Sequence, residues 1–170
     1  ETLVPHVTSV IETQKGEIWI ATSGRGIFRF NEDGCFFGSY VALMSQIGND
    51  FISGIFEDRD ENLWITSENN GLYYFNRTTG EIRRFFSPEL TSYCDVSAVV
   101  QDQQGVIYAG ILSGGIFRFD GNGFIPLFEE KEMAHLMVKS LIVKDDRLLI
   151  GTDGDGLKRL NLTTGKLESM

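Results

Sequence analysis

Acidic and amide side chains crowd a few short stretches of the chain, where metal chemistry would be sought first. Residues 58–62 read Asp-Arg-Asp-Glu-Asn and resemble the start of a calcium-binding loop. Such a loop needs glycine at its sixth position and a carboxylate at its twelfth. Leu63 and Asn69 stand there instead. We therefore interpret 58–62 as an exposed turn and predict no metal site in it.

Patterns for catalysis and phosphate binding are weak. His6 and His135 stand at unrelated places, and nothing in the sequence pairs either with a nucleophile. The segment 24–26, Gly-Arg-Gly, is too short for a dinucleotide or phosphate loop, and no helical pattern follows it. We expect no catalytic residue and no cofactor, and we predict that the chain is not an enzyme.

The strongest feature of the sequence is a fourfold internal repeat. A glycine that opens a strand-like segment recurs at steps of 45, 44 and 41 residues, and a bulky residue on the preceding segment recurs at the same steps. The glycines are Gly26, Gly71, Gly115 and Gly156, and the bulky residues are Trp19, Trp64, Tyr108 and Leu149. Two independent landmarks with one spacing indicate a true repeat.

Each repeat contains four short strand-like segments separated by turns. The expected strands are 7–12, 17–22, 26–30 and 35–40; 52–57, 62–67, 71–75 and 81–86; 96–101, 106–111, 115–119 and 124–128; and 139–143, 147–151, 156–160 and a last one from 166. This period and strand number are typical of a β-propeller. We predict an all-β fold of four consecutive four-stranded antiparallel blades, at about 6–46, 47–91, 92–135 and 136–170. They would form a single fragment of a larger propeller.

The repeat also explains several residues that suggest chemistry on their own. The segment 153–156, Asp-Gly-Asp-Gly, offers two carboxylates, but it occupies the same repeat turn as 23–26 and 68–71. The sequence Asn-x-Thr-Thr-Gly at 76–80 and 161–165 matches a glycosylation signal, yet it is again one repeated turn. We expect Trp19 and Trp64 to pack between blades rather than to hold a ligand.

Composition excludes some classes of function. The 170 residues are 42% apolar with a net charge of −9, which argues against a nucleic-acid partner because phosphates require a basic surface. No run of about 18 apolar residues is present, so we expect no direct membrane insertion by this segment. Cys35 and Cys94 stand at different repeat positions, and we expect no disulfide between them.

Ligand contacts are expected on one face, where the turns after each second strand meet the crossovers between repeats. The candidate ligand-binding residues are Arg25, Asn69, Asn70, Tyr93, Asp153 and Asp155. Asn, Asp and Arg side chains can hydrogen-bond sugar hydroxyls, and a tyrosine ring offers a flat surface for stacking. For each of them a solvated turn residue is the simpler alternative.

The repeats resemble a known motif, the two-component regulator propeller repeat. The likeness is carried in the first repeat by Ser-Val-Ile-Glu at 9–12, Gly16, Ile-Trp-Ile at 18–20, Thr22 and Gly26. The second repeat carries it at 56–58, at Leu-Trp-Ile 63–65 and at Gly71. The third and fourth keep the glycines but replace tryptophan. In that family the repeats build the sensor regions of bacterial hybrid two-component systems, with many more blades.

The resemblance implies extracytoplasmic sensing. We expect a periplasmic propeller region of an inner-membrane-anchored sensor that binds an oligosaccharide or other small ligand and signals to a histidine kinase outside this chain. A protein-interaction scaffold without a small ligand is the first alternative. A propeller lyase or glycosidase is the second, and it would need acid and base residues clustered on the axis. Open blade edges would also favour self-association.

Overall fold

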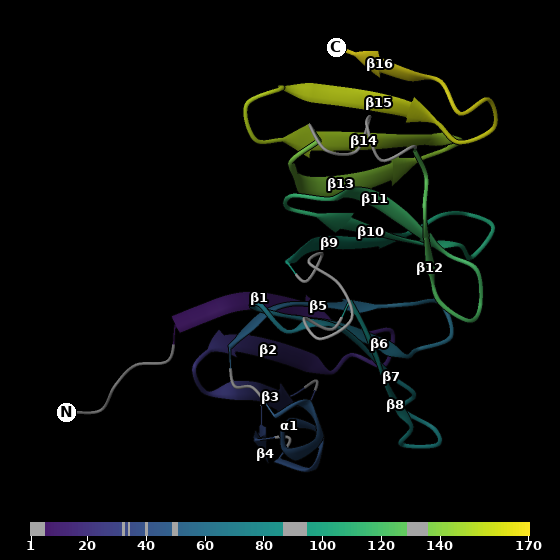
Figure 1. Ribbon diagram of the computed structural model, residues 1–170. Helices are drawn as coiled ribbons and strands as arrows, with labels where there is room; N and C mark the ends of the chain where they lie inside the picture. The colour runs from purple at the N-terminus through teal and green to yellow at the C-terminus, as the bar shows by residue number, and fades with distance from the viewer. Residues whose placement is uncertain are drawn as a thin grey trace. The chain divides into compact units, whose positions relative to one another are not determined.

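The computed structural model describes residues 6–31, 33, 35–39, 41–48, 51–86, 95–128 and 136–170. The described elements are β-strands apart from one short helix (Figure 1). In chain order they are β1 (His6–Glu12), β2 (Ile18–Ser23), β3 (Gly26–Phe30), β4 (Phe36–Ser39), α1 (Val41–Ile47), β5 (Ile52–Glu57), β6 (Leu63–Ser67), β7 (Gly71–Phe75), β8 (Ile82–Phe85), β9 (Val96–Gln101), β10 (Ile107–Ile111), β11 (Gly115–Phe119), β12 (Phe124–Pro126), β13 (Val138–Lys144), β14 (Arg147–Thr152), β15 (Leu157–Asn161) and β16 (Leu167–Ser169).

The strands form four separate sheets of four strands each, and neighbours in each sheet are consecutive in the chain. All pairings are antiparallel. The sixteen predicted strands are confirmed, with ends that shift by one or two residues. We refer below to the first (β1–β4), second (β5–β8), third (β9–β12) and fourth (β13–β16) sheets.

The helix α1 was not predicted. It lies in the crossover at 41–50, where only a connection was expected. Leu43 and Ile47 are four residues apart and therefore share one side of the helix, and both are buried, with 1% and 4% of their surface exposed. A single apolar stripe is enough to dock a two-turn helix against a core formed by two sheets, but it is too short to stand out as a period in the sequence.

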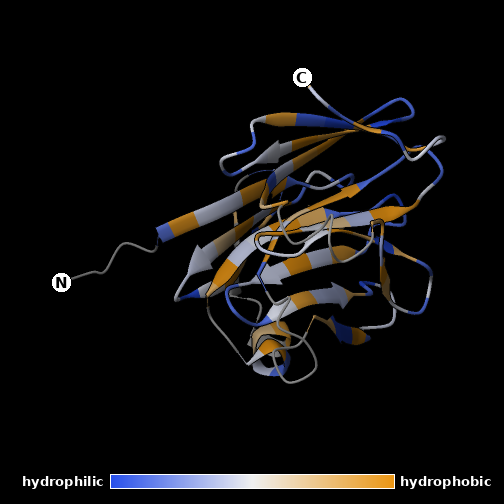
Figure 2. Cartoon of the chain, turned by 45° about the horizontal axis from the view of Figure 1, so that its top comes forward, coloured by the Kyte–Doolittle hydropathy of each residue, from blue (hydrophilic) through white to orange (hydrophobic). Residues whose placement is uncertain are grey.

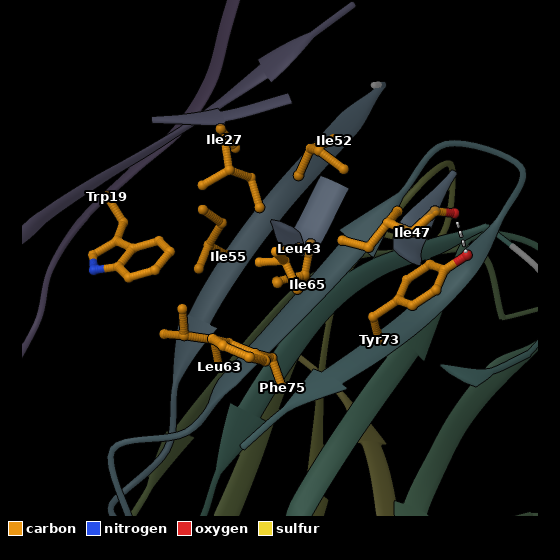
Figure 3. Packing of buried hydrophobic residues seen from close by; sticks show 11 residues of the cluster. Trp19, Ile27, Leu43, Ile47, Ile52, Ile55, Leu63, Ile65, Tyr73 and Phe75 are labelled. Atoms are coloured by element: carbon orange, nitrogen blue, oxygen red, sulfur yellow. Dashed lines mark hydrogen bonds between the residues drawn. The ribbon is translucent and has the colours of Figure 1, made fainter. Parts of the chain in front are cut away.

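The chain divides into two compact units, Glu1–Leu90 and Thr91–Met170, which we call the N-terminal and C-terminal halves. The core of the N-terminal half lies between the first and second sheets (Figure 3). There Trp19 and Ile27 of the first sheet pack with Ile55 and Leu63 of the second. The α1 residues Leu43 and Ile47 close the same cluster, and the Tyr73 hydroxyl donates a 3.1 Å hydrogen bond to the Ile47 carbonyl.

The core of the C-terminal half is built in the same way from the third and fourth sheets. Tyr108 and Ile116 pack with Val138, Leu148 and Ile150. Gly110 lies at this contact, and a methyl group added there would stand 2.5 Å from Val138 Cγ1. The absence of a side chain at residue 110 therefore sets how closely the two sheets approach.

Burial of the second strands explains their composition. All five residues of β6 and all five of β10 are buried, so these strands are covered on both faces. A strand covered on both faces reads as a continuous apolar run, which is the pattern of Ile107–Ile111 and of the first three residues of β6, Leu63, Trp64 and Ile65. Figure 2 shows the hydropathy of each residue, with most apolar residues on the strands and most polar residues in the turns.

A bulge near the start of each first strand ties neighbouring sheets together. The register shifts at residues 8, 53, 97 and 139. At two of these positions a hydroxyl reaches the first strand of the next sheet: Thr8 Oγ1 donates to the Ile52 carbonyl and Ser97 Oγ to the Val138 carbonyl, each at 2.6 Å. Within each half, first strands therefore lie side by side, as adjacent blades require.

Candidate ligand-binding rim

The turns that follow each second strand owe their shape to the repeated glycine. Residues 26, 71, 115 and 156 all have φ between 70° and 91°, a left-handed conformation that favours glycine. In two of the turns a threonine adds a second brace, because Thr22 and Thr152 donate to the carbonyls of Gly26 and Gly156 at 2.8 and 2.7 Å. We call the turns 23–26, 68–71, 112–115 and 153–156 the rim turns.

In the second, third and fourth sheets, the residue before the first strand packs against a rim turn of its own sheet. The carbonyls of Phe51, Asp95 and Met137 accept the backbone N–H groups of residues 68, 112 and 153, at 2.9, 2.9 and 2.8 Å. The rim turns are thus held by the segments that enter the sheets. The repeat position of Phe51, Asp95 and Met137, which the sequence pattern did not single out, therefore lies next to the rim turns.

Phe51 stands at the centre of this arrangement in the N-terminal half. Its backbone forms a β-bridge with Ser23 of the first sheet and a hydrogen bond with Glu68 of the second. A Cβ on Gly24 would lie 3.7 Å from the Phe51 ring. The side chain is nevertheless 50% exposed. Phe51 therefore offers an aromatic surface between two rim turns, and sequence reasoning missed it.

The candidate residues of the N-terminal half differ in how far they are already engaged. Arg25 and Asn69 are exposed on the two turns that flank Phe51, and Asn69 has φ 52°. Asn70 is bound within its own sheet: its Nδ2 donates to Tyr73 Oη at 2.9 Å and its carbonyl accepts from Arg84 Nε at 3.0 Å. The structure thus brings Arg25 and Asn69 to the Phe51 surface, while Asn70 braces the turn.

The candidate residues of the C-terminal half lie together on the rim turn 153–156. Asp153 and Asp155 are both exposed, and their carboxylates pair with Lys139 at 3.2 Å and Lys158 at 3.4 Å. Each acid therefore has its own lysine rather than a shared cation. The part of the chain that the structure describes contains no group of three or more His, Cys, Asp or Glu side chains that could hold a metal.

Tyr93, like Cys94 and His135, lies outside the described residues. Cys35 is a free cysteine.

At the opposite ends of the second and third sheets, buried carboxylates organise the turn after the first strand. The interpretation of 58–62 as an exposed turn is right for Arg59 and Asp60 and wrong for Asp58 and Asn62, which are 5% and 8% exposed. Asp58 Oδ1 accepts the backbone N–H groups of residues 60 and 62, and its Oδ2 accepts the Trp64 indole N–H at 3.0 Å. The carboxylate is therefore a structural acceptor.

Asp102 repeats this arrangement with a different donor. Its Oδ1 accepts the N–H groups of residues 104 and 106, and its Oδ2 accepts the Tyr108 hydroxyl at 2.9 Å. Burial, together with that hydrogen bond, raises the pKa of Tyr108 to about 12. The signal that could have revealed both residues is an aspartate six positions before the bulky landmark residue in two repeats.

A second polar cluster joins the first and second sheets. Arg77 pairs with Glu17 of the first sheet and with Glu57 of the second, the latter at 3.0 Å. Glu17 also accepts from Arg29 and from the Trp19 indole. Burial acts to raise the pKa of Glu17, but the hydrogen bonds from Trp19 and Arg29 and the charges of both arginines lower it overall. We call Glu17, Arg29, Glu57 and Arg77 the clasp.

The corresponding space between the third and fourth sheets is open. Leu162 and Val106 replace Arg77 and Glu17 in the repeat, and a cavity of about 410 Å³ lies beside them, also lined by Asp102 and Tyr108. A smaller cavity of about 160 Å³ lies on the fourth sheet. Neither of these two cavities is lined by a candidate ligand-binding residue. Separately, no described helix is long and apolar enough to cross a membrane.

Comparisons with known proteins agree with this architecture. Residues 46–69 match the family model of the two component regulator propeller. Two similar solved structures are described as extracellular domains of hybrid two component systems from B. thetaiotaomicron, BT4673 and BT3049. They are 21% and 19% identical, with a TM-score of 0.76 for both, over 97% and 98% of this chain. The chain covers only 23% and 24% of those proteins.

A more distant neighbour belongs to another functional class. Virginiamycin B lyase from Staphylococcus aureus is 15% identical with a TM-score of 0.70, over 96% of this chain and 55% of that protein. No curated protein sequence matches the chain. The predicted fold class is confirmed, and so is the resemblance read from the repeats: the chain consists of β-propeller blades and carries the two component regulator propeller repeat.

Proposed function

We propose that this chain is part of the extracytoplasmic sensor propeller of a hybrid two-component system. The observation that carries the proposal is the fold match over nearly the whole chain to extracellular domains of such systems, together with the family repeat at 46–69. Because the chain covers about a quarter of those proteins, the four blades would be part of a larger propeller. The kinase would lie outside this chain, and the sensor would face the periplasm.

The ligand would be an oligosaccharide or another small polar molecule bound at the rim turns. In the N-terminal half the Phe51 ring would stack on a sugar face, and Arg25 and Asn69 would hydrogen-bond hydroxyls. Asp153 and Asp155 would serve in the same way on the turn of the C-terminal half. Asn70 and Tyr93 complete the set of candidates, with Asn70 acting through the shape of its turn.

Binding of oligosaccharides to the 170-residue chain tests this proposal. A panel of plant and host oligosaccharides would be screened by thermal shift, and hits would be measured by isothermal titration calorimetry. Phe51→Ala and Arg25→Ala should each weaken binding by about tenfold, as expected for the loss of one stacking or charged contact. Lys15 is an exposed lysine in the turn between β1 and β2, at the end of the first sheet opposite to Arg25. Lys15→Ala should therefore leave the affinity for the oligosaccharide unchanged.

Three results would count against the proposal in different ways. Binding that is unchanged by both Phe51→Ala and Arg25→Ala would show that the ligand site lies elsewhere in the protein. Failure of the whole panel to bind would favour a scaffold that recognises protein partners. Turnover of any tested polysaccharide or of virginiamycin B would support the enzyme alternative, which the fold likeness to virginiamycin B lyase makes worth testing.

A further inference from the structure

The cavity between the third and fourth sheets lies where the clasp stands between the first and second sheets. Its volume of about 410 Å³ is in the range of sites for small molecules. The described residues that line it all belong to these two consecutive sheets of the C-terminal half and to their turns. A further blade at either end of the chain would therefore not fill this space. We call it the interblade cavity.

The inner part of the interblade cavity is apolar, whereas the clasp is charged. Val106 and Leu162 stand at the repeat positions of Glu17 and Arg77, and both line the cavity. Both also pack against the core of the C-terminal half. The buried Tyr108 lines the cavity beside them. The space therefore has an apolar surface that could hold an aliphatic chain.

The clasp shows which chemical group the matching space holds in the N-terminal half. The guanidinium of Arg77 pairs there with Glu17 and Glu57. It lies 5.5 Å from the centroid of the Trp19 ring. A leucine at residue 162 keeps the aliphatic part of such a side chain but lacks the cation. The interblade cavity thus lies where the repeat places a guanidinium in the other half.

Negative charge is concentrated at the interblade cavity. Among the described residues that line it, three are aspartates and none is a lysine or arginine. The donors that the described chain offers to the Asp102 carboxylate are neutral: two backbone N–H groups and the Tyr108 hydroxyl. Asp146 pairs with the exposed Arg147 at 3.5 Å. Asp145 is exposed and forms no ion pair with a described residue. The cavity can therefore accept a further cation.

The arginine that the repeat places at this joint does not supply that cation. Arg118 stands at the position of Arg29 in the clasp and lies opposite Tyr108 on β11. Its side chain is exposed and is not part of the described lining of the cavity. A cation in the cavity would therefore come from outside the described part of the chain.

We propose that the interblade cavity binds an organic cation that carries a guanidinium or ammonium group on a short aliphatic stem. The stem would pack on Val106 and Leu162, and the head group would pair with Asp145 and Asp146 through charge-assisted hydrogen bonds. A free small molecule and an arginine or lysine side chain of a peptide both have this chemistry. The cavity lies at the ends of the sheets opposite the rim turns, so the proposal is independent of ligand binding there.

Two-dimensional NMR of the ¹⁵N-labelled 170-residue chain, titrated with n-butylguanidinium, tests the proposal. Chemical shifts should change at the backbone N–H groups of residues 102–106, 145–146 and 162–163. The titration should fit a Kd of about 1 mM, as expected for a ligand of this size. 1-Butanol and butyrate keep the stem but lack the positive charge, and each should bind at least about tenfold more weakly.

Three variants connect the binding to the cavity. Asp145→Asn removes one carboxylate and should raise the Kd about tenfold. Leu162→Arg introduces the residue that the second sheet has at this repeat position, so its own side chain should fill the cavity and abolish binding of the probe. Asp120→Asn removes an exposed carboxylate that does not line the cavity, and it should leave the Kd unchanged. The NMR spectrum of each variant shows whether it is folded.

A blocked peptide, N-acetyl-Gly-Arg-Gly-amide, distinguishes the two sources of the cation. Tighter binding of the peptide than of n-butylguanidinium at the same residues would identify a peptide side chain as the ligand. Tighter binding of n-butylguanidinium would identify a free small molecule.

The proposal is overturned if n-butylguanidinium changes no shifts at these residues up to about 20 mM. It is also overturned if 1-butanol binds equally well, or if Asp145→Asn and Leu162→Arg both leave the Kd unchanged. Each of these outcomes leaves the oligosaccharide measurements untouched, because the rim turns carry none of the substituted residues.

Discussion

The glycines of the rim turns share a positive φ but differ in which atoms surround them. A Cβ on Gly71 would stand 2.4 Å from the Phe85 carbonyl oxygen and 2.5 Å from that of Phe86, and backbone atoms cannot swing away. Gly24 has a similar positive φ of 92°, but a Cβ there would meet only the Phe51 ring, at 3.7 Å. The two positions therefore separate conformational strain from steric overlap.

Substitution by alanine should reveal this difference. Gly24→Ala should lower the free energy of unfolding by about 1 kcal/mol, the cost of a left-handed alanine. Gly71→Ala should lower it by about 3 kcal/mol, because the outer strand must also move. Both tryptophans lie in the N-terminal half, so urea unfolding followed by tryptophan fluorescence measures both variants. Equal losses would contradict the role given to the Phe85 and Phe86 carbonyls.

The two buried aspartates predict a second contrast, in the response to asparagine. In Asp58→Asn the new amide N–H₂ would face the Trp64 indole N–H, which is a donor only. In Asp102→Asn the amide would face the Tyr108 hydroxyl, which can accept. We expect losses of about 2–3 kcal/mol for Asp58→Asn and about 1 kcal/mol for Asp102→Asn, measured by thermal and urea unfolding with circular dichroism.

A reversal of that order would contradict the hydrogen-bond assignment at both turns. Hydrogen exchange at the N–H groups of residues 60, 62, 104 and 106 provides a local control, since these groups donate to the two carboxylates. An asparagine that keeps its Oδ1 in place should leave their protection largely intact.

At the scale of elements, the clasp joins two sheets through charges rather than through apolar contact alone. The side chains of Arg77, Glu57 and Glu17 are only 12%, 8% and 14% exposed, so solvent screens them less than surface pairs. Both Arg29 and Arg77 also lie over the Trp19 ring, 5.7 and 5.5 Å from its centroid. A cation near an aromatic face adds to the attraction.

The lowered pKa of Glu17 makes the clasp sensitive to acid. A carboxyl whose folded pKa lies below its usual value of 4.5 stabilises the fold above that value. The contribution is lost as the pH falls through the folded pKa. Glu17→Gln should cost about 2 kcal/mol at neutral pH, and its urea midpoint should approach that of the unmodified chain as the pH falls below 4.5 and through the lowered pKa.

Tryptophan fluorescence in urea from pH 3 to 8 measures this convergence. Arg147→Gln, which removes an exposed charge from the same repeat position in the fourth sheet, is the matched control and should run parallel to the unmodified chain. A gap between the Glu17→Gln and unmodified curves that stays constant with pH would show that the carboxylate charge is not what stabilises the joint.

At the scale of the whole molecule, the net charge of −9 governs partners more than fold. Gel-shift assays with duplex and single-stranded DNA and with RNA, at about 150 mM salt, should show no binding, because no counterions are released without a basic surface. Salt-dependent retardation would contradict the excluded nucleic-acid class. A basic control protein in the same assay would establish its sensitivity.

Sequence patterns alone predict the four sheets, the sixteen described strands and the position of the rim turns. These features are local: alternation of apolar residues, turn residues such as Asn76 and Asn161, and the glycine that ends each rim turn are all present within one repeat. The Oδ1 atoms of Asn76 and Asn161 accept the backbone N–H groups of the residues two and three positions later, which confirms that their glycosylation-like signals are turns.

Contacts between residues of different repeats become visible only in the folded chain. Asp58 looks like a surface acid until Trp64 and the turn amides close around it. The role of Arg77 depends on Glu17, which is 60 residues away in the sequence and pairs with it in the folded chain. Phe51 joins the rim because two turns of different sheets meet its backbone, and α1 docks because Leu43 and Ile47 pack into the core between the first and second sheets. Such contacts are non-local, so no spacing within a single repeat could reveal them.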